Sequence, residues 1–370
     1  MRTFHCTNCQ NLVFFENVVC LNCRFLLAYL PDATEMAALE QDADGTWRRG
    51  DKAYKLCANN LNHQICNWAI PAEDPEDLCR SCRLTHVIPD LTLAGNKEAW
   101  HLLEVSKRRL LYTLIELSLP LSRKTAANPA GVEFEFLNDL TTPNGDLSRV
   151  LTGHDNGVIT INVAEADDVY REQQRTRQHE PYRTLLGHFR HEIGHYYWDR
   201  LIQDSPRLEE FRRLFGDERA DYQRALNTHY QNGPPPTWAE DFISAYASTH
   251  PWEDWAESWA HVLHMIDALE TAESVGVSIK PRRADEPALI IPKRTFSAGG
   301  IDFGEMIRAW LSLTYALNNF TRGLGLPDSY PFVLSERVVG KLKFIYETIK
   351  PGVLLTEELP APVAGNLKSA

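Results

Sequence analysis

The placement of the cysteines constrains the fold of this chain more than any other feature. All eight cysteines lie within the first 82 of 370 residues, and they fall into two sets of four. The sets are Cys6, Cys9, Cys20 and Cys23, and then Cys57, Cys66, Cys79 and Cys82. The first set is a CxxC…CxxC pattern. Two CxxC turns can present four thiolates to one ion, which predicts a tetrahedral zinc site.

The second set is spaced less regularly, because only Cys79 and Cys82 form a CxxC pair. His63 or His86 could replace one of its sulfurs. Pairing in sequence order is the simplest arrangement, and an interleaved one stays possible. Four thiolates leave no open position for chemistry, so both sets are predicted to hold structural Zn²⁺.

Other uses of the cysteines are less compatible with the sequence. The chain starts MRTFHCTNCQ, without the apolar core of a signal peptide, so we expect a cytoplasmic protein whose thiols stay reduced. The spacings are not those of a ferredoxin. No apolar run approaches the roughly 20 residues that cross a bilayer, so no membrane partner is expected.

We predict an α+β protein with a small β-rich head and a helix-rich body. The head is expected to cover residues 1–90, the body 97–358 and a flexible tail 359–370. Helices are expected at the following positions: 97–119 with Asn96 as its cap, 184–202, 206–230, from Pro251 onward, 302–320 and 335–349. Strands are expected at 132–137 and in a hairpin at 149–163.

The charge balance limits the class of partner. The chain carries a net charge of −12, and residues 1–90 hold eight Lys and Arg against twelve Asp and Glu. Binding to nucleic acid depends on basic residues, so no nucleic-acid partner is expected. The head is expected either to dock a protein partner or to act as a scaffold.

The stretch His191-Glu192-Ile193-Gly194-His195 predicts a catalytic metal site. Residues four apart share one face of a helix, so His191 and His195 can bind one Zn²⁺. Glu192 can then act as the general base on a water molecule. His188 lies on nearly the same face and is expected to line the cleft or bind the backbone.

A catalytic zinc site needs a third protein ligand, and Glu253 in PWEDWAESWAH (251–261) is the best candidate. Glu257 lies one turn further along the same helical face and could orient a histidine ring. Glu218, in GDERADY (216–222), is a rival ligand, although a solvated helix face is the preferred interpretation of that stretch. His261 and His264 continue the glutamate stripe and are expected to be interior histidines.

This pattern resembles the gluzincin metallopeptidases, which pair an HExxH helix with a later helix of the form ExxxD or ExxAE. The stretch Glu253-Asp254-Trp255-Ala256-Glu257 matches ExxAE. The resemblance implies Glu253 as a zinc ligand, Glu257 as its outer partner and Tyr246 as a group that stabilises the oxyanion. It also implies that 157–162 is an edge strand along which a peptide substrate lies.

The zinc-ribbon-like head together with this body resembles a bacterial family of zinc-binding metallopeptidases, over nearly the whole chain. The resemblance implies a zinc-dependent peptidase with one catalytic and two structural Zn²⁺ ions, acting on a peptide or protein. The alternative is a non-catalytic zinc-ribbon protein that serves as a scaffold for protein interactions.

Overall fold

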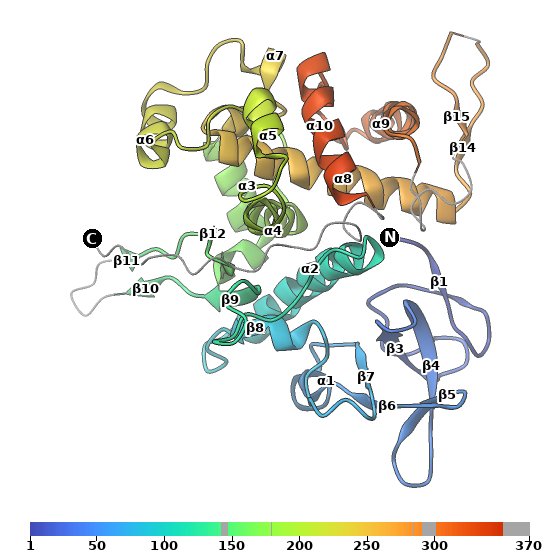
Figure 1. Ribbon diagram of the computed structural model, residues 1–370. Coiled ribbons are helices and arrows are strands. Elements are labelled where there is room, and N and C mark those ends of the chain that lie inside the picture. The colour runs from blue at the N-terminus through green and yellow to red at the C-terminus, as the bar shows by residue number, and fades with distance from the viewer. Residues whose placement is uncertain (142–146, 179, 284, 291–300, 351–370) are drawn as a thin grey trace.

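The computed structural model describes residues 1–141, 147–178, 180–283, 285–290 and 301–350. As expected, it combines α-helices and β-strands, with a β-rich head followed by a helix-rich body (Figure 1). The predicted tail, 359–370, lies outside the described residues.

The head consists of a short hairpin and a five-stranded antiparallel sheet in the order β3-β4-β5-β6-β7. In its longest strands, apolar stretches such as LLAYL and MAAL are almost wholly buried. The strands and the one helix of the head are β1 Phe4–His5, β2 Leu12–Val13, β3 Leu26–Leu30, β4 Glu35–Gln41, β5 Trp47–Arg49, β6 Lys52–Leu56, α1 Ala58–His63 and β7 Ala69–Pro71.

A strand from the predicted head belongs to the sheet of the body. β8 (Thr85–Val87) pairs in parallel with β9 (Glu133–Leu137), and the sheet has the order β12-β13-β9-β8. β12 (Gly153–Asp155) and β13 (Val158–Asn162) form the expected hairpin. β13 lies between β12 and β9, so the expectation that 157–162 is the edge strand is wrong: the edge strands of this sheet are β12 and β8.

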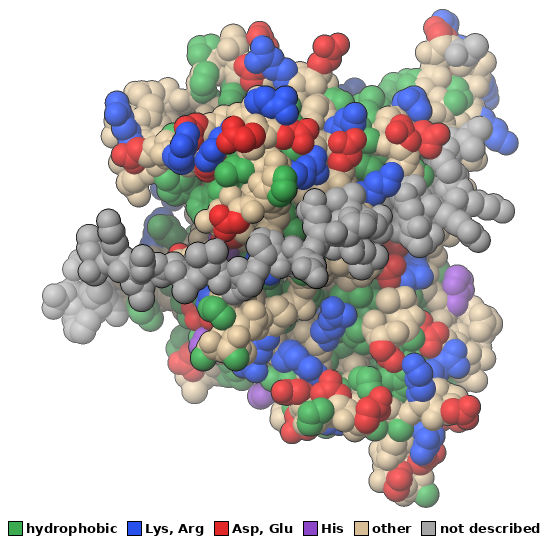
Figure 2. Space-filling model, in the orientation of Figure 1, with side chains coloured by type: hydrophobic (Ala, Val, Ile, Leu, Met, Phe, Trp, Pro, Cys, Tyr) green, Lys and Arg blue, Asp and Glu red, His purple; other side chains and the backbone are tan. Residues whose placement is uncertain are grey.

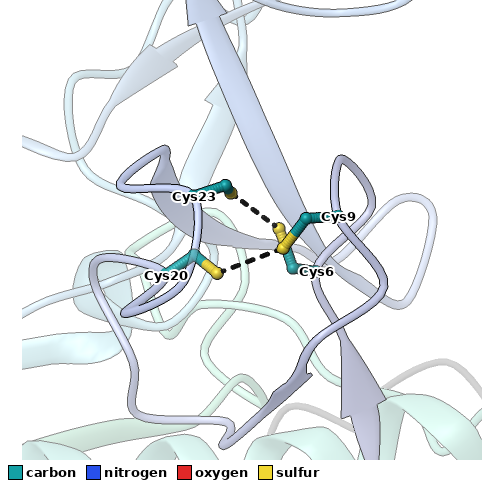
Figure 3. A group of neighbouring side chains, drawn as sticks. All are labelled: Cys6, Cys9, Cys20 and Cys23. Atoms are coloured by element: carbon teal, nitrogen blue, oxygen red, sulfur yellow. Dashed lines mark hydrogen bonds between the residues drawn. The ribbon is translucent and has the colours of Figure 1, made fainter.

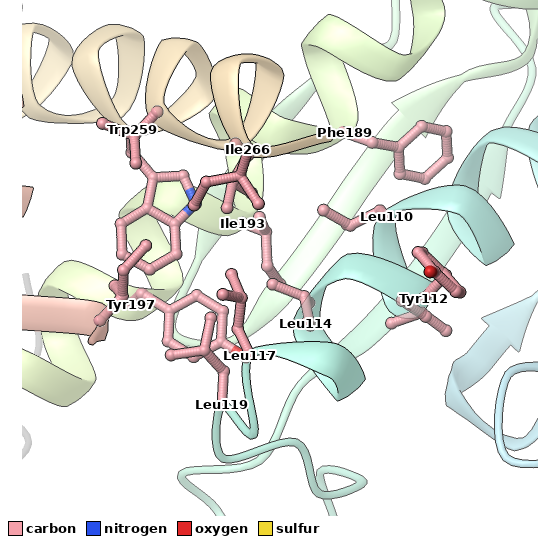
Figure 4. Close-up of a cluster of buried hydrophobic side chains, with 14 of the residues drawn as sticks. Leu110, Tyr112, Leu114, Leu117, Leu119, Phe189, Ile193, Tyr197, Trp259 and Ile266 are labelled. Carbon is pink, nitrogen blue, oxygen red and sulfur yellow. The ribbon is translucent and has the colours of Figure 1, made fainter. Parts of the chain in front are cut away.

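Helix α2 (Asn96–Glu116) lies between the head and the rest of the body (Figure 1). Gly95 is its N-cap residue, so the prediction that Asn96 caps the helix is wrong. The Asn96 amide instead donates to the carbonyl of Asp90 and to the side chain of Asn138. Apolar residues of α2 pack against α4 (Leu185–Leu201) and α8 (Pro251–Ser274) in the core that Figure 4 shows.

The predicted helix at 206–230 is two helices, α5 (Leu208–Phe215) and α6 (Tyr222–Asn232). Gly216 ends α5 with a φ of 105°, a conformation that favours glycine, so the chain turns there. The expected C-terminal helices are confirmed as α9 (Phe303–Gly323) and α10 (Glu336–Ile349). The remaining elements are β10 Leu140–Thr141, β11 Leu147–Ser148, α3 Asp168–Arg177, α7 Trp238–Asp241, β14 Ser278–Ile279, β15 Leu289–Ile290 and the 3-10 turns η1 Cys82–Leu84, η2 Val163–Ala166 and η3 Tyr246–Ser248.

Side chains of both signs are interspersed over the face in Figure 2. Among the described residues, no helix combines the length and the apolar composition that crossing a bilayer requires.

Candidate metal centres

Two crossing helices, α4 and α8, build the candidate catalytic centre. The Thr184 hydroxyl accepts a hydrogen bond from the Gly187 amide and caps α4. The His250 ring accepts one from the Trp252 amide and caps α8, whose first residue is Pro251, as the sequence predicts. Both helices therefore start at fixed positions and hold their side chains in register.

The crossing is close because α4 carries a glycine there. A Cβ atom on Gly194 would lie 3.1 Å from the Cα of Ala256 and 3.2 Å from the Trp259 ring. The Trp255 indole donates to the Gly194 carbonyl at 2.8 Å. The glycine between the two histidines thus lets α8 approach α4 at the level of the site.

Three side-chain atoms converge at this crossing. The His191 Nε2 atom lies 2.9 Å from Glu253 Oε2 and 3.2 Å from His195 Nε2. His195 Nε2 lies 3.5 Å from Glu253 Oε2. Tetrahedral bonds of about 2.0–2.1 Å to zinc would place ligand atoms roughly 3.3 Å apart, so the spacing fits Zn²⁺.

The outer partners of this cluster also fit a cation. Glu257 accepts a bond from His191 Nδ1 at 2.7 Å, which leaves the Nε2 lone pair of His191 facing the Glu253 carboxylate. Two electron-rich atoms facing each other are favourable only with a positive charge between them. The Ser244 hydroxyl donates to the second Glu257 oxygen at 2.7 Å and fixes that carboxylate.

Tyr222 also contacts the cluster, and this contact was not predicted from the sequence. Its hydroxyl, on the first residue of α6, donates to Glu253 Oε1 at 2.6 Å. Each oxygen of Glu253 therefore has a defined direction, with Oε2 toward the histidines and Oε1 toward Tyr222. No spacing signal links Tyr222 to a helix that begins almost thirty residues later.

The pKa values of the two acids of the centre shift in opposite directions, although burial raises both. Desolvation raises the pKa of Glu192, and the charge of nearby Glu253 adds to this increase. Burial also raises the pKa of Glu253, but the imidazoles of His195 and His191 outweigh it and hold this pKa well below the ordinary value. Within the described part of the chain, the Glu192 carboxylate has no hydrogen-bond partner.

Tyr246 lies beside the cluster. It is the first residue of η3, its ring centroid is 6.0 Å from that of His191, and burial raises its pKa well above the ordinary value. His154, on the edge strand β12, stacks on His195 with ring centroids 6.3 Å apart, so the sheet edge lies next to the cluster.

The rival candidates have other partners. Both oxygens of Glu218 accept bonds from the Arg212 guanidinium, at 2.6 and 3.0 Å. His188 faces Glu165 at 3.2 Å. His261 is bonded to the Tyr330 hydroxyl, and His264 contacts Arg190.

Each cysteine set comes together in the head. In the first, the Cys6–Cys23 and Cys9–Cys20 sulfurs are 3.6 Å apart (Figure 3). In the second, the buried Cys66 and Cys79 sulfurs are also 3.6 Å apart. Zinc–sulfur bonds of about 2.3 Å predict roughly 3.8 Å, whereas a disulfide would need about 2 Å.

The immediate surroundings of the cysteines suit bound thiolates. A hydrogen bond from Asn8 lowers the pKa of Cys23 to about 6. In the second set, the backbone amides of Trp68, Cys79 and Cys82 donate to sulfur atoms. His63 packs on Trp100 instead, and exposed His86 lies 3.9 Å from Glu133, so the second cluster consists of its four cysteines.

Comparison with known proteins finds similarity over two successive segments of the chain. Residues 96–348 match a family described as "Putative zinc-binding metallo-peptidase", and residues 3–93 match a zinc-ribbon domain. Uncharacterized proteins of Mycobacterium tuberculosis and Mycobacterium bovis are 42% identical over 350 residues, which is 94% of this chain and 95% of theirs. No solved structure matches the chain.

Proposed function

Because the chain belongs to the family described as "Putative zinc-binding metallo-peptidase", we propose that it is a zinc-dependent enzyme that hydrolyses peptide bonds in peptides or proteins. The observation that carries this proposal is the convergence of His191, His195 and Glu253 on one point, beside a carboxylate without a partner. In this proposal Glu253 is the third ligand of the catalytic zinc, and the ExxAE stretch is of the gluzincin type.

The residues around the cluster divide the chemistry among them. When bound, Zn²⁺ polarises the scissile carbonyl and lowers the pKa of water. Glu192 accepts the proton of the attacking water and passes it to the leaving amine, and its raised pKa suits a group that must do both. Tyr246 would donate to the developing oxyanion. Glu257 orients His191, and Ser244 orients Glu257.

The head would hold two further zinc ions in closed sites, with a structural role. Eight free cysteines arranged as ligands suit a reducing compartment, which supports a cytoplasmic location for the protein.

Two exposed apolar side chains beside the first cluster would suit a protein partner: Leu21 is 76% exposed and Phe14 is 69% exposed. A protein that only docks partners through this surface is the alternative function.

Replacement of the proposed base tests the mechanism. Glu192→Gln should lower peptide cleavage by roughly 10²–10⁴-fold while zinc stays bound, because only the proton acceptor is lost. Glu98→Gln, which alters an exposed glutamate of α2, is the matched control. Cleavage that persists in a zinc-loaded Glu192→Gln variant would contradict this role.

The number of zinc ions bound per chain distinguishes the proposed peptidase from the alternative, a protein that only docks partners. We expect three zinc ions per chain by atomic emission, falling to two in His191→Ala. A wild-type protein that binds two, and that cleaves no peptide in a mixed library, would support the scaffold alternative.

A further inference from the structure

Two of the three ligands in the candidate metal centre have an outer hydrogen-bond partner, and His195 has none. His191 is bonded through Nδ1 to Glu257, and Glu253 accepts from Tyr222. The Nδ1 atom of His195 is buried and has no hydrogen-bond partner within the described part of the chain. A neutral histidine that binds Zn²⁺ through Nε2 carries its hydrogen on Nδ1, so this atom would be a buried donor that needs an acceptor.

Asp199 is the carboxylate that α4 places next to His195. It lies four residues further along the helix, so the two side chains share one face. The Cα–Cβ bonds of a helix tilt toward its N-terminus, so the side chain of Asp199 leans toward the turn that carries His195.

The edge strand β12 locates this carboxylate independently. Asp199 Oδ2 lies 3.9 Å from the Nε2 atom of His154, and the ring of His154 stacks on that of His195. The side chain of Asp199 is only 28% exposed. The carboxylate is therefore largely enclosed beside the two imidazole rings.

Asp199 is not committed to another partner. Across the described ranges, its oxygens accept no hydrogen bond, and His154 is the only basic group that lies within 4 Å of them. His154 cannot donate there, because its Nε2 lone pair already accepts the Gly157 amide at 2.8 Å. An acceptor without a donor thus lies beside a donor without an acceptor.

We propose that Asp199 is the outer partner of His195 in the zinc-loaded protein, where its carboxylate accepts the Nδ1–H group directly or through one water molecule. Asp199 is then a positioning residue, because it acts on the metal only through the ring of His195. Each histidine of the centre would be held by one carboxylate, His191 by Glu257 from α8 and His195 by Asp199 from its own helix. The inference rests on the proposed function, since it requires His195 to bind a metal ion.

The carboxylate would do more than orient the ring. An acceptor on Nδ1 fixes the tautomer of a metal-bound histidine, and a charged acceptor also makes the opposite nitrogen a stronger electron donor. Loss of Asp199 should therefore weaken the hold of His195 on the metal and leave the two cysteine clusters unaffected.

Zinc affinity of the full-length protein tests this role by competition with a chelator. Asp199→Ala should weaken zinc binding at the centre of His191, His195 and Glu253 by about 10–100-fold, with both cysteine clusters unchanged. Asp199→Asn has the same shape and keeps an acceptor oxygen without the charge. It should show a smaller but measurable loss of affinity.

Proton NMR of the cobalt-loaded protein reports on His195 itself. The unpaired electrons of Co²⁺ shift the ring N–H signals of ligand histidines away from the rest of the spectrum, and the cysteine clusters contain no imidazole. We expect two such signals in wild type. In Asp199→Ala one of them should exchange faster with solvent, because that N–H group has lost its acceptor.

Asp204→Ala is the matched control, because it removes an exposed carboxylate just beyond the end of α4. It should behave like wild type in both measurements. Wild-type zinc affinity in Asp199→Ala or in Asp199→Asn, or unchanged exchange of both N–H signals, would overturn the role of Asp199 and leave the peptidase proposal intact. A wild-type protein that binds zinc only at its cysteine clusters would refute the proposed peptidase, and this inference with it.

Discussion

At the scale of single residues, the two oxygens of Glu253 determine whether the cluster can hold a metal. Oε2 faces both histidines, and Oε1 accepts the Tyr222 hydroxyl. The histidine pair could be predicted because HExxH is local and periodic. The Tyr222 contact could not, because it joins residues 31 positions apart through a turn whose path depends on the packing of the whole body.

Tyr222→Phe should weaken zinc binding at the catalytic centre by about 10–100-fold, since the freed carboxylate can rotate away from the histidines. Competition with a zinc chelator measures this loss, and both cysteine sites should keep their affinity. Tyr230→Phe is the matched control, because Tyr230 lies on the same helix and is 66% exposed. Equal zinc affinity in Tyr222→Phe and wild type would remove Tyr222 from this role.

The buried Glu165 predicts a defined pH dependence of stability. Burial raises its pKa, but the contact with His188 at 3.2 Å and the charge and hydrogen bond of Arg183 outweigh this and lower the pKa to about 2. A lowered folded-state pKa stabilises the fold above the unfolded value of 4.5, and this contribution is lost as pH falls toward 2.

Glu165→Gln should therefore reduce the free energy of unfolding at pH 7 by an amount on the order of 3 kcal/mol. Urea unfolding of variant and wild type across pH 7 to 3 should show this difference shrinking below pH 4.5. A difference that stays constant with pH would contradict the proposed charge interaction.

At the scale of elements, the separation of α4 and α8 depends on Gly194. The sequence predicted both helices and the proline that begins α8, because these signals are local. It did not predict the break at Gly216 or the edge position of β12. Both depend on contacts that form only when the sheet and the helices assemble.

Gly194→Ala places a methyl group 3.1 Å from the Ala256 backbone, so the two helices must move apart. We expect a loss of stability of about 1–3 kcal/mol and weaker zinc binding by His195 and Glu253. Gly340→Ala is the matched control, because a Cβ atom there meets nothing within 4 Å inside α10. It should leave stability unchanged or raise it by up to about 1 kcal/mol. Unaltered stability and zinc affinity in Gly194→Ala would show that the crossing tolerates a wider separation.

At the scale of the whole molecule, the head and the body share a sheet, a core and several ion pairs. Arg2 and Glu16 in the head form ion pairs with Glu116 and Arg109 of α2. The two-part organisation was predictable because cysteine density and helical periodicity change abruptly along the chain. The contacts between the parts were not, since surface and interface arginines are indistinguishable in a sequence.

Arg108 is the clearest of these interface residues. It is 3% exposed, its Nη1 atom has no hydrogen-bond partner, and Glu104 Oε2 lies 3.8 Å away. Burial lowers its pKa, but the thiolates of Cys66, Cys82 and Cys79, together with Glu104, raise it overall. A zinc ion held by these four thiolates would keep a net charge of −2, and Arg108 would then act as its counter-ion from the body.

Arg108→Met keeps the apolar volume but removes that counter-ion, so the second cluster should lose zinc at least tenfold faster to a chromogenic chelator. The first cluster, which does not contact Arg108, should release zinc at the wild-type rate. Arg109→Gln is the matched control, because Arg109 adjoins Arg108 in the sequence but is 45% exposed and pairs with Glu16. Identical release from all sites in Arg108→Met and wild type would mean that the charge of the cluster is compensated elsewhere. Faster release from the second cluster alone would show that a metal site in the head depends on a helix of the body.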